Sequence, residues 1–183
     1  MSMIFITGAA GVGKSTAVQL LKNMLPSDKF SVHDIDEGDL WKDDYVAWRD
    51  KKINDWIQRS IINHASGVSI ILCGIIYPED VAKAPAYLGN DSVKYILLDA
   101  PQEIIRERFL AREGTPEQRS MFNGDRLKRM ESKLSRQLEI SLELRNIYSL
   151  LDKALIIDTS QLNPQQVADA IYIELTAANH PSV

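Results

Sequence analysis

Four residues near the amino end have the types and spacing needed to bind phosphate groups. Gly8, Gly13, Lys14 and Ser15 fit the pattern G-x-x-x-x-G-K-[ST], the phosphate-binding P-loop. The glycines let backbone N–H groups curl around an anion, the lysine adds a full positive charge, and the serine hydroxyl can bind Mg²⁺. We therefore predict that a nucleoside triphosphate and Mg²⁺ bind here. The residues expected to hold the phosphates are Gly8, Ala9, Ala10, Gly11, Val12, Gly13, Lys14, Ser15 and Thr16.

The sequence on either side of this loop is typical of a strand followed by a helix. Residues 3–7 form a short apolar run, and a segment with helical spacing extends from Lys14 to Met24 before Pro26. The first N–H groups of such a helix, and its positive dipole end, would face the same anion. This order of elements favours a phosphate site over a glycine-rich surface turn.

Two carboxylates follow the second predicted strand. Asp34 and Asp36 are separated by one residue, so in an extended segment both side chains point the same way. One of them could organise Mg²⁺ through water, and the other could accept a proton from an acceptor hydroxyl or hold the polar groups of the acceptor, with Asp36 favoured for the acid–base role. The alternative for either residue alone is a structural role in a turn or a helix cap.

Arginines are concentrated after the fourth predicted strand. Arg108 and Arg112 lie four residues apart on one face of a predicted helix, before breaks at Gly114 and Asn123-Gly124. Guanidinium groups stabilise the oxygens of a phosphoryl group during its transfer, so we predict functional roles for both arginines. Residues 113–137 should form an arginine-rich lid that closes and excludes water. Solvated ion pairs with neighbouring glutamates are the alternative for most of these arginines.

Predicted strands and helices alternate along the chain, as they do in α/β folds. The expected strands lie at residues 3–7, 30–33, 68–76, 95–98 and 154–157. We predict a five-stranded, mostly parallel sheet with helices on both faces. Ligands of such folds bind beyond the carboxyl ends of the strands. The P-loop, the two aspartates, Gly74 and Asp99 all fall there, and we expect Gly74 to border the acceptor.

Size, charge and cysteine content narrow the class of protein. The chain has 183 residues, of which 45% are hydrophobic, and a net charge of −4. We expect one domain over residues 1–183. The acidic balance argues against a nucleic-acid partner, and no apolar stretch is long enough to span a membrane. Because Cys73 is the only cysteine, no internal disulfide can form, and we expect a cytoplasmic location.

The segment at about residues 37–65 should form the acceptor side of the site. All three tryptophans lie in it, and Trp41, Tyr45 and Trp48 cluster near its start. Packing in the core is the ordinary role of such rings. The alternative is that Trp41 and its neighbours line a cleft for a ring-shaped acceptor, which would favour a nucleoside or a nucleotide.

The order of these motifs resembles that of the small P-loop kinases, which include the nucleoside monophosphate kinases and the shikimate- and gluconate-kinase-like enzymes. The resemblance rests on the P-loop, Asp34-Ile35-Asp36, the two arginines and residues 156–160, Ile-Ile-Asp-Thr-Ser. It implies ATP as donor, with Mg²⁺ at Ser15, Asp34 near Mg²⁺ or the acceptor, and Asp36 at the acceptor. It also implies that Arg108 lies beside the adenine, that Arg112 reaches the transferred phosphate, and that residues 160–162 border the base.

The chain departs from the nucleoside monophosphate kinases at the end of the third strand. They carry Asp-Gly-Phe-Pro-Arg there, whereas this chain has Cys-Gly-Ile-Ile-Tyr at residues 73–77. We therefore expect an ATP- and Mg²⁺-dependent phosphotransferase that acts on a small-molecule acceptor, whose identity stays open. The alternatives are a nucleotide-dependent switch or hydrolase, and a kinase of a sugar acid, an antibiotic or a nucleic-acid end.

Overall fold

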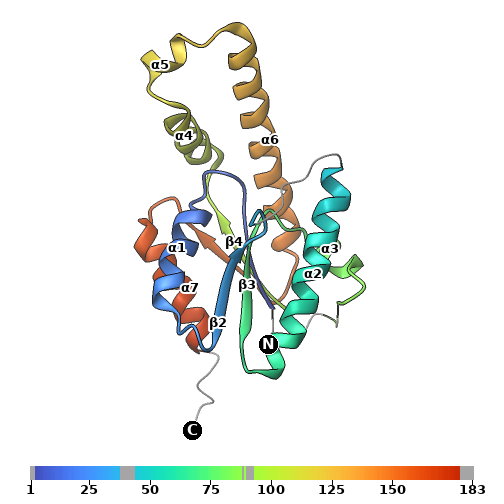
Figure 1. Cartoon of the computed structure of the whole chain (residues 1–183). Helices are drawn as coiled ribbons and strands as arrows, with labels where there is room; N and C mark the ends of the chain where they lie inside the picture. The colour runs from blue at the N-terminus through green and yellow to red at the C-terminus, as the bar shows by residue number, and fades with distance from the viewer. Residues whose placement is uncertain (1–2, 38–43, 88, 90–92, 178–183) are drawn as a thin grey trace.

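A five-stranded sheet with the strand order β2-β3-β1-β4-β5 lies at the centre of the computed structural model (Figure 1). The structure describes residues 3–37, 44–87, 89 and 93–177. All four neighbouring pairs of strands are parallel, so the predicted α/β fold is confirmed. The strands are β1 Met3–Thr7, β2 Phe30–Asp34, β3 Ser69–Gly74, β4 Val93–Asp99 and β5 Ala154–Asp158.

Helices cover both faces of the sheet. The helices α1 and α7 lie together on one face, and α2, α3 and α6 lie on the other (Figure 1). No helix in the described part of the chain combines the length and apolar character needed to cross a membrane. The helices are α1 Lys14–Met24, α2 Tyr45–Ala65, α3 Pro78–Lys83, α4 Gln102–Glu113, α5 Pro116–Ser120, α6 Gly124–Tyr148 and α7 Pro164–Ala177.

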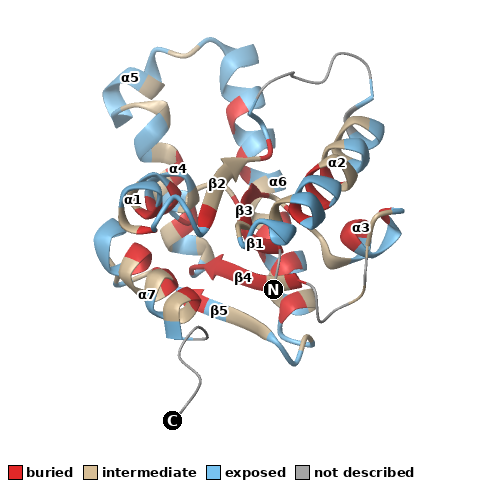
Figure 2. Cartoon of the chain, turned by 60° about the horizontal axis from the view of Figure 1, so that its bottom comes forward, coloured by how far each residue is buried: buried red, intermediate tan, exposed pale blue. Residues whose placement is uncertain are grey.

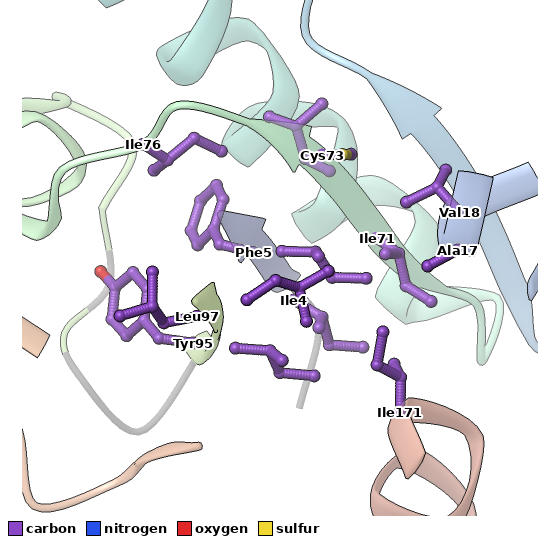
Figure 3. Close-up of a cluster of buried hydrophobic side chains, with 14 of the residues drawn as sticks. Ile4, Phe5, Ala17, Val18, Ile71, Cys73, Ile76, Tyr95, Leu97 and Ile171 are labelled. Atoms are coloured by element: carbon purple, nitrogen blue, oxygen red, sulfur yellow. The ribbon is translucent and has the colours of Figure 1, made fainter. Parts of the chain in front are cut away.

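The main core surrounds β1, whose residues are all buried. A central strand covered on both faces needs a continuous apolar run rather than an alternating one, which explains the sequence Met-Ile-Phe-Ile-Thr. Figure 3 shows Ile4 of β1 and Ile71 of β3 on the side of the sheet that faces Ile171 of α7, whereas Phe5 lies on the other side. Cys73 is buried in the same core, and burial raises the pKa of its thiol to about 12. The thiol is therefore a packing group and not a nucleophile.

The helices α4, α5 and the first half of α6 project beyond the sheet and have a small apolar cluster of their own. Phe109, Met130 and Leu134 are buried there, with Phe122 packed against them. The helix α5 has no buried residue and is exposed (Figure 2). We call this projection, which includes residues 113–137, the lid; that this segment closes over the site stays a prediction.

The long helix α6 begins earlier than its sequence suggests. It starts at Gly124, directly at the predicted break and inside the segment 113–137. The side chain of Asn123 caps it by accepting a hydrogen bond from the N–H of Arg126 at 2.9 Å, and such a cap stabilises the first turn. The break at Asn123-Gly124 is therefore a helix cap, and one continuous helix connects the lid to the core.

Candidate active site

The loop between β1 and α1 has a shape that depends on glycine. Gly8 has a φ of +149°, and a Cβ at this position would lie 2.3 Å from the carbonyl oxygen of Leu98. Gly13 has a φ of +94° and caps α1 without a side-chain hydrogen bond to the helix. Because no described side chain caps this helix, its first N–H groups point to the space in front of the loop.

Thr7, the last residue of β1, ties the start of the loop to the end of β3. Its hydroxyl accepts a hydrogen bond from the N–H of Ile76 at 3.0 Å and lies 3.3 Å from the carbonyl oxygen of Ile76, to which it can donate. The hydroxyl of Tyr148 on α6 donates to the same carbonyl at 2.9 Å. All three residues are buried, so the loop and the end of β3 are held in one fixed relative position.

A cavity of about 510 Å³ opens at the carboxyl ends of the strands, in front of this loop. It unites residues from four places in the sequence that we predicted to be functional. Ala9 and Val12 are buried beneath it, and each is 1% exposed. The predicted residues that line the cavity are Ala10, Gly11, Gly13, Lys14, Ser15, Thr16, Asp34, Asp36, Gly74, Arg108 and Arg112.

The ammonium group of Lys14 donates a hydrogen bond to a neutral partner. Its Nζ donates to the carbonyl oxygen of Ala9 at 2.7 Å. The pKa of Lys14 is lowered to about 8, mainly by burial and also by the charge of Arg112, although Asp34 and Asp36 act in the opposite direction. Burial disfavours the charged form of a lysine unless an anion compensates it. The site therefore fits an anionic ligand.

Asp34 and Asp36 reach the cavity through a turn and not through an extended segment. Asp34 is the last residue of β2, and its Oδ1 accepts a hydrogen bond from the N–H of Asp36 at 3.0 Å. The expectation of an extended pair is therefore wrong, because the side chain of Asp34 stabilises a turn directly after the strand. Burial raises the pKa of Asp36, and the charge of Asp34 raises it further.

Gly74 has a packing role as well as a place on the cavity wall. The N–H of Ile35, between the two aspartates, donates to the carbonyl oxygen of Cys73 at 2.8 Å. A Cβ on Gly74 would lie 2.6 Å from Cγ2 of Ile35. The absence of a side chain at Gly74 therefore lets the turn after β2 close against the end of β3.

Arg108 connects α4 to the loop that follows β5. Its Nη2 donates to the carbonyl oxygen of Thr159 at 2.7 Å, and its Nη1 donates to the Thr159 hydroxyl at 3.0 Å. Thr159 is itself held by the end of β4, since its N–H donates to the carbonyl oxygen of Asp99 at 2.8 Å. Arg108 thus sits between the main cavity and a second one of about 220 Å³, which is also lined by Leu162 and Pro164.

Arg112 lines the main cavity, while other arginines of the lid hold the lid together. The Cζ of Arg112 lies 5.9 Å from the ring centroid of Phe109. Arg119 donates to the carbonyl oxygen of Leu110 at 2.8 Å, and Arg136 forms ion pairs with Glu139 and Glu143. Arg119 and Arg136 therefore contact other groups of the protein, which is a structural role and not a role in phosphoryl transfer.

The described tryptophans do not line the cavity. Trp56 is buried in the main core, with its ring centroid 4.3 Å from that of His33. Trp48 lies beneath the ammonium of Lys52, whose Nζ is 5.8 Å from the ring centroid. Trp41, which we predicted to contact the acceptor, lies outside the described residues.

Comparison with known proteins assigns the chain to a family. A family model described as the AAA domain matches residues 4–147, which are 144 of the 183 residues. The chain belongs to the AAA-domain family. No curated protein matches its sequence.

Solved structures of three kinases are similar to this AAA domain over nearly its whole length. A sugar kinase from a Janibacter species is 19% identical with a TM-score of 0.62, over 97% of this chain and 96% of that one. A gluconokinase from Sinorhizobium meliloti is 16% identical with a TM-score of 0.57, over 98% of each chain. Shikimate kinase from Aquifex aeolicus is 18% identical with a TM-score of 0.53, over 97% of this chain and 98% of that one. The fold of the small P-loop kinases, predicted from the motif order, is confirmed.

Two contacts of α6 with the edge of this site were not predicted. Oε1 of Gln137 accepts a hydrogen bond from the N–H of Ala10, in the phosphate loop, at 2.7 Å. Arg145 donates through Nε to the carboxylate of Asp99 at 2.5 Å, so the aspartate that ends β4 is part of an ion pair. No local sequence signal could have identified either pair, because the partners lie 127 and 46 residues apart.

Proposed function

We propose that this AAA domain is an ATP- and Mg²⁺-dependent phosphotransferase that acts on a hydroxyl group of a small molecule. The observation that carries the proposal is one cavity lined both by the phosphate loop with Lys14 and by the pair Asp34 and Asp36. A donor site and a candidate base therefore face the same space. The names of the similar structures, a sugar kinase, a gluconokinase and a shikimate kinase, support this class of reaction.

The loop side of the cavity has the groups that a triphosphate needs. The N–H groups at the start of α1 and the ammonium of Lys14 would bind the phosphate oxygens, which explains why a buried lysine stands there. The Ser15 hydroxyl and Asp34 would hold Mg²⁺. No group of three or more metal-ligating side chains occurs in the described part of the chain, and Mg²⁺ in such sites is usually bound by one or two carboxylates together with substrate phosphates.

The second cavity has the position expected for the base of the nucleotide. It adjoins the phosphate loop at Gly11 and Gly13, and Leu162 and Pro164 give it apolar walls. Arg108 is fixed at its rim by two hydrogen bonds to Thr159. A planar guanidinium held in this way can stack on an aromatic ring.

On the acceptor side, Asp36 would orient the acceptor hydroxyl and accept its proton. Its pKa is raised by burial and by Asp34, which moves a carboxylate toward the basicity that a general base needs. Arg112 would stabilise the oxygens of the phosphoryl group in transfer. The bound nucleotide supplies that phosphoryl group, and closure of the lid would exclude water.

A screen of acceptors tests the proposal. ADP release from Mg·ATP would be measured with nucleosides, nucleotides, sugar acids, sugars and aminoglycoside antibiotics, each against an acceptor-free control. The proposal predicts that at least one hydroxyl compound accelerates ADP release and becomes phosphorylated. Release that is equally fast without any acceptor would instead identify a hydrolase or a nucleotide-dependent switch.

A further inference from the structure

The side chain of Gln137 on α6 accepts a hydrogen bond from one of the backbone N–H groups of the phosphate loop. Oε1 of Gln137 lies 2.7 Å from the backbone nitrogen of Ala10, and the bond is partly buried. Ala10 lines the main cavity together with Lys14 and Ser15. A loop whose N–H groups bind phosphate oxygens therefore has one of these groups bonded to a neutral amide oxygen.

Gln137 lies where α6 passes from the lid to the core. One turn before it, Leu134 belongs to the apolar cluster of the lid, and one turn after it, Ile140 belongs to the main core. At the next residue, the carbonyl oxygen of Leu138 is 3.4 Å from Nε2 of Gln102 on α4. A change at Gln137 can therefore act on both parts of the helix.

The chemistry of this hydrogen bond makes it exchangeable. A side-chain amide is a neutral acceptor, and hydrogen bonds to ionised oxygens such as those of phosphate are about twice as strong. A phosphate oxygen that reaches the N–H of Ala10 would therefore displace the amide oxygen of Gln137. The displaced side chain would no longer tie α6 to the loop.

We infer that Gln137 is a positioning residue that links occupancy of the phosphate loop to the lid. In the empty protein it holds α6 against the loop through Ala10. When nucleotide binds, a phosphate oxygen takes over the N–H of Ala10, and α6 is released to move with the lid. This inference rests on the proposed function, because it requires a nucleotide at the loop.

The variants Gln137→Met and Gln137→Glu test the exchange by calorimetric titration with Mg·ATP. Methionine keeps the length of the side chain and removes the acceptor, so no internal bond has to be broken and the Kd should fall roughly 2- to 10-fold. Glutamate is a charged acceptor that also repels phosphate, so the Kd should rise about 10-fold or more. Ser135→Met, at an exposed position of the same helix, is the matched control and should keep the wild-type Kd.

Hydrogen exchange at the amide of Ala10 gives a second readout that a role in packing alone would not change. Exchange should be slow in the empty wild-type protein, fast in empty Gln137→Met, and slow in the nucleotide complexes of both. A Kd for Gln137→Met equal to or higher than the wild-type Kd would overturn the inference. Equal rates of hydrogen exchange at Ala10 in the two nucleotide-free proteins would also overturn it. If wild type itself fails to bind Mg·ATP, the proposed function falls and the inference falls with it, whereas wild-type binding with no gain in Gln137→Met overturns the inference alone.

Discussion

The donor side and the acceptor side of the cavity are built on different kinds of strand. The phosphate loop continues β1, which lies between β3 and β4 and is buried throughout. Asp34 ends β2 and Asp36 follows it, and β2 is an edge strand in which only Phe30 is buried. The donor side is therefore formed by one continuous, buried stretch of sequence, whereas the acceptor side depends on a turn and on its packing against Gly74.

This contrast predicts that a change on the donor side lowers the reaction rate with every acceptor. Lys14→Ala should have the largest effect. The variant removes the full positive charge from the loop, so ADP release should fall by roughly 10³-fold or more. It should keep the thermal stability of wild type or exceed it, because the buried ammonium has a lowered pKa and its charged form is disfavoured by burial. Steady-state kinetics and thermal unfolding check both statements, and substantial turnover in this variant would contradict the donor assignment.

Asp36→Asn should separate the acceptor side from the donor side. Loss of the candidate base should lower kcat by about 10²-fold, while the Kd of Mg·ATP stays near the wild-type value. Since the pKa of Asp36 is raised, its proton is lost at a higher pH than from an ordinary aspartate. The wild-type rate should therefore rise with pH through that raised pKa, and this limb of the pH profile should vanish in the variant. An unchanged profile would show that Asp36 is not the base.

Gly74→Ala should have an intermediate effect that a second substitution relieves. The added Cβ would lie 2.6 Å from Ile35, and overpacking of this kind costs about 1–3 kcal/mol. We expect a loss of stability in that range and a loss of phosphate transfer greater than the loss of nucleotide affinity. The double variant Gly74→Ala with Ile35→Ala should lose less stability than the sum of the two single losses, because the Cγ2 group that clashes is gone. Denaturant unfolding of the three variants measures this, and simple additivity of the two losses would contradict the packing role of Gly74.

Shortening a buried side chain of the lid should have the smallest effect on the free energy of global unfolding. Leu72→Ala, at a fully buried position of β3, should cost about 2–5 kcal/mol of unfolding free energy. Leu134→Ala removes the same atoms from the small cluster of the lid, which can open locally without unfolding the sheet. It should therefore lower the unfolding midpoint less and change KM by a few-fold. Equal loss of stability in the two variants would show that lid and core unfold as one unit.

The elements and the donor loop could be predicted from the sequence because their signals are local. Lys14–Met24 is helical as predicted, and Gly8 and Gly13 adopt the conformations that their motif requires. The link between Arg108 and Thr159 and that between Ala10 and Gln137 could not be predicted, because each joins distant segments that meet only in the folded chain. From the sequence, the turn at Asp34 is only the alternative to the expected extended segment, which the side-chain hydrogen bond to the N–H of Asp36 replaces.

Calorimetric titration of Mg·ATP at pH 8, in two buffers of different ionisation enthalpy, tests the central claim most directly. Lys14 has a pKa of about 8 in the empty loop, and phosphate oxygens around it must raise that pKa. The account predicts binding with net uptake of up to about half a proton, and no such uptake in Lys14→Ala. Absence of binding, or wild-type binding whose heat does not depend on the buffer, would contradict the claim that the loop and Lys14 hold the triphosphate.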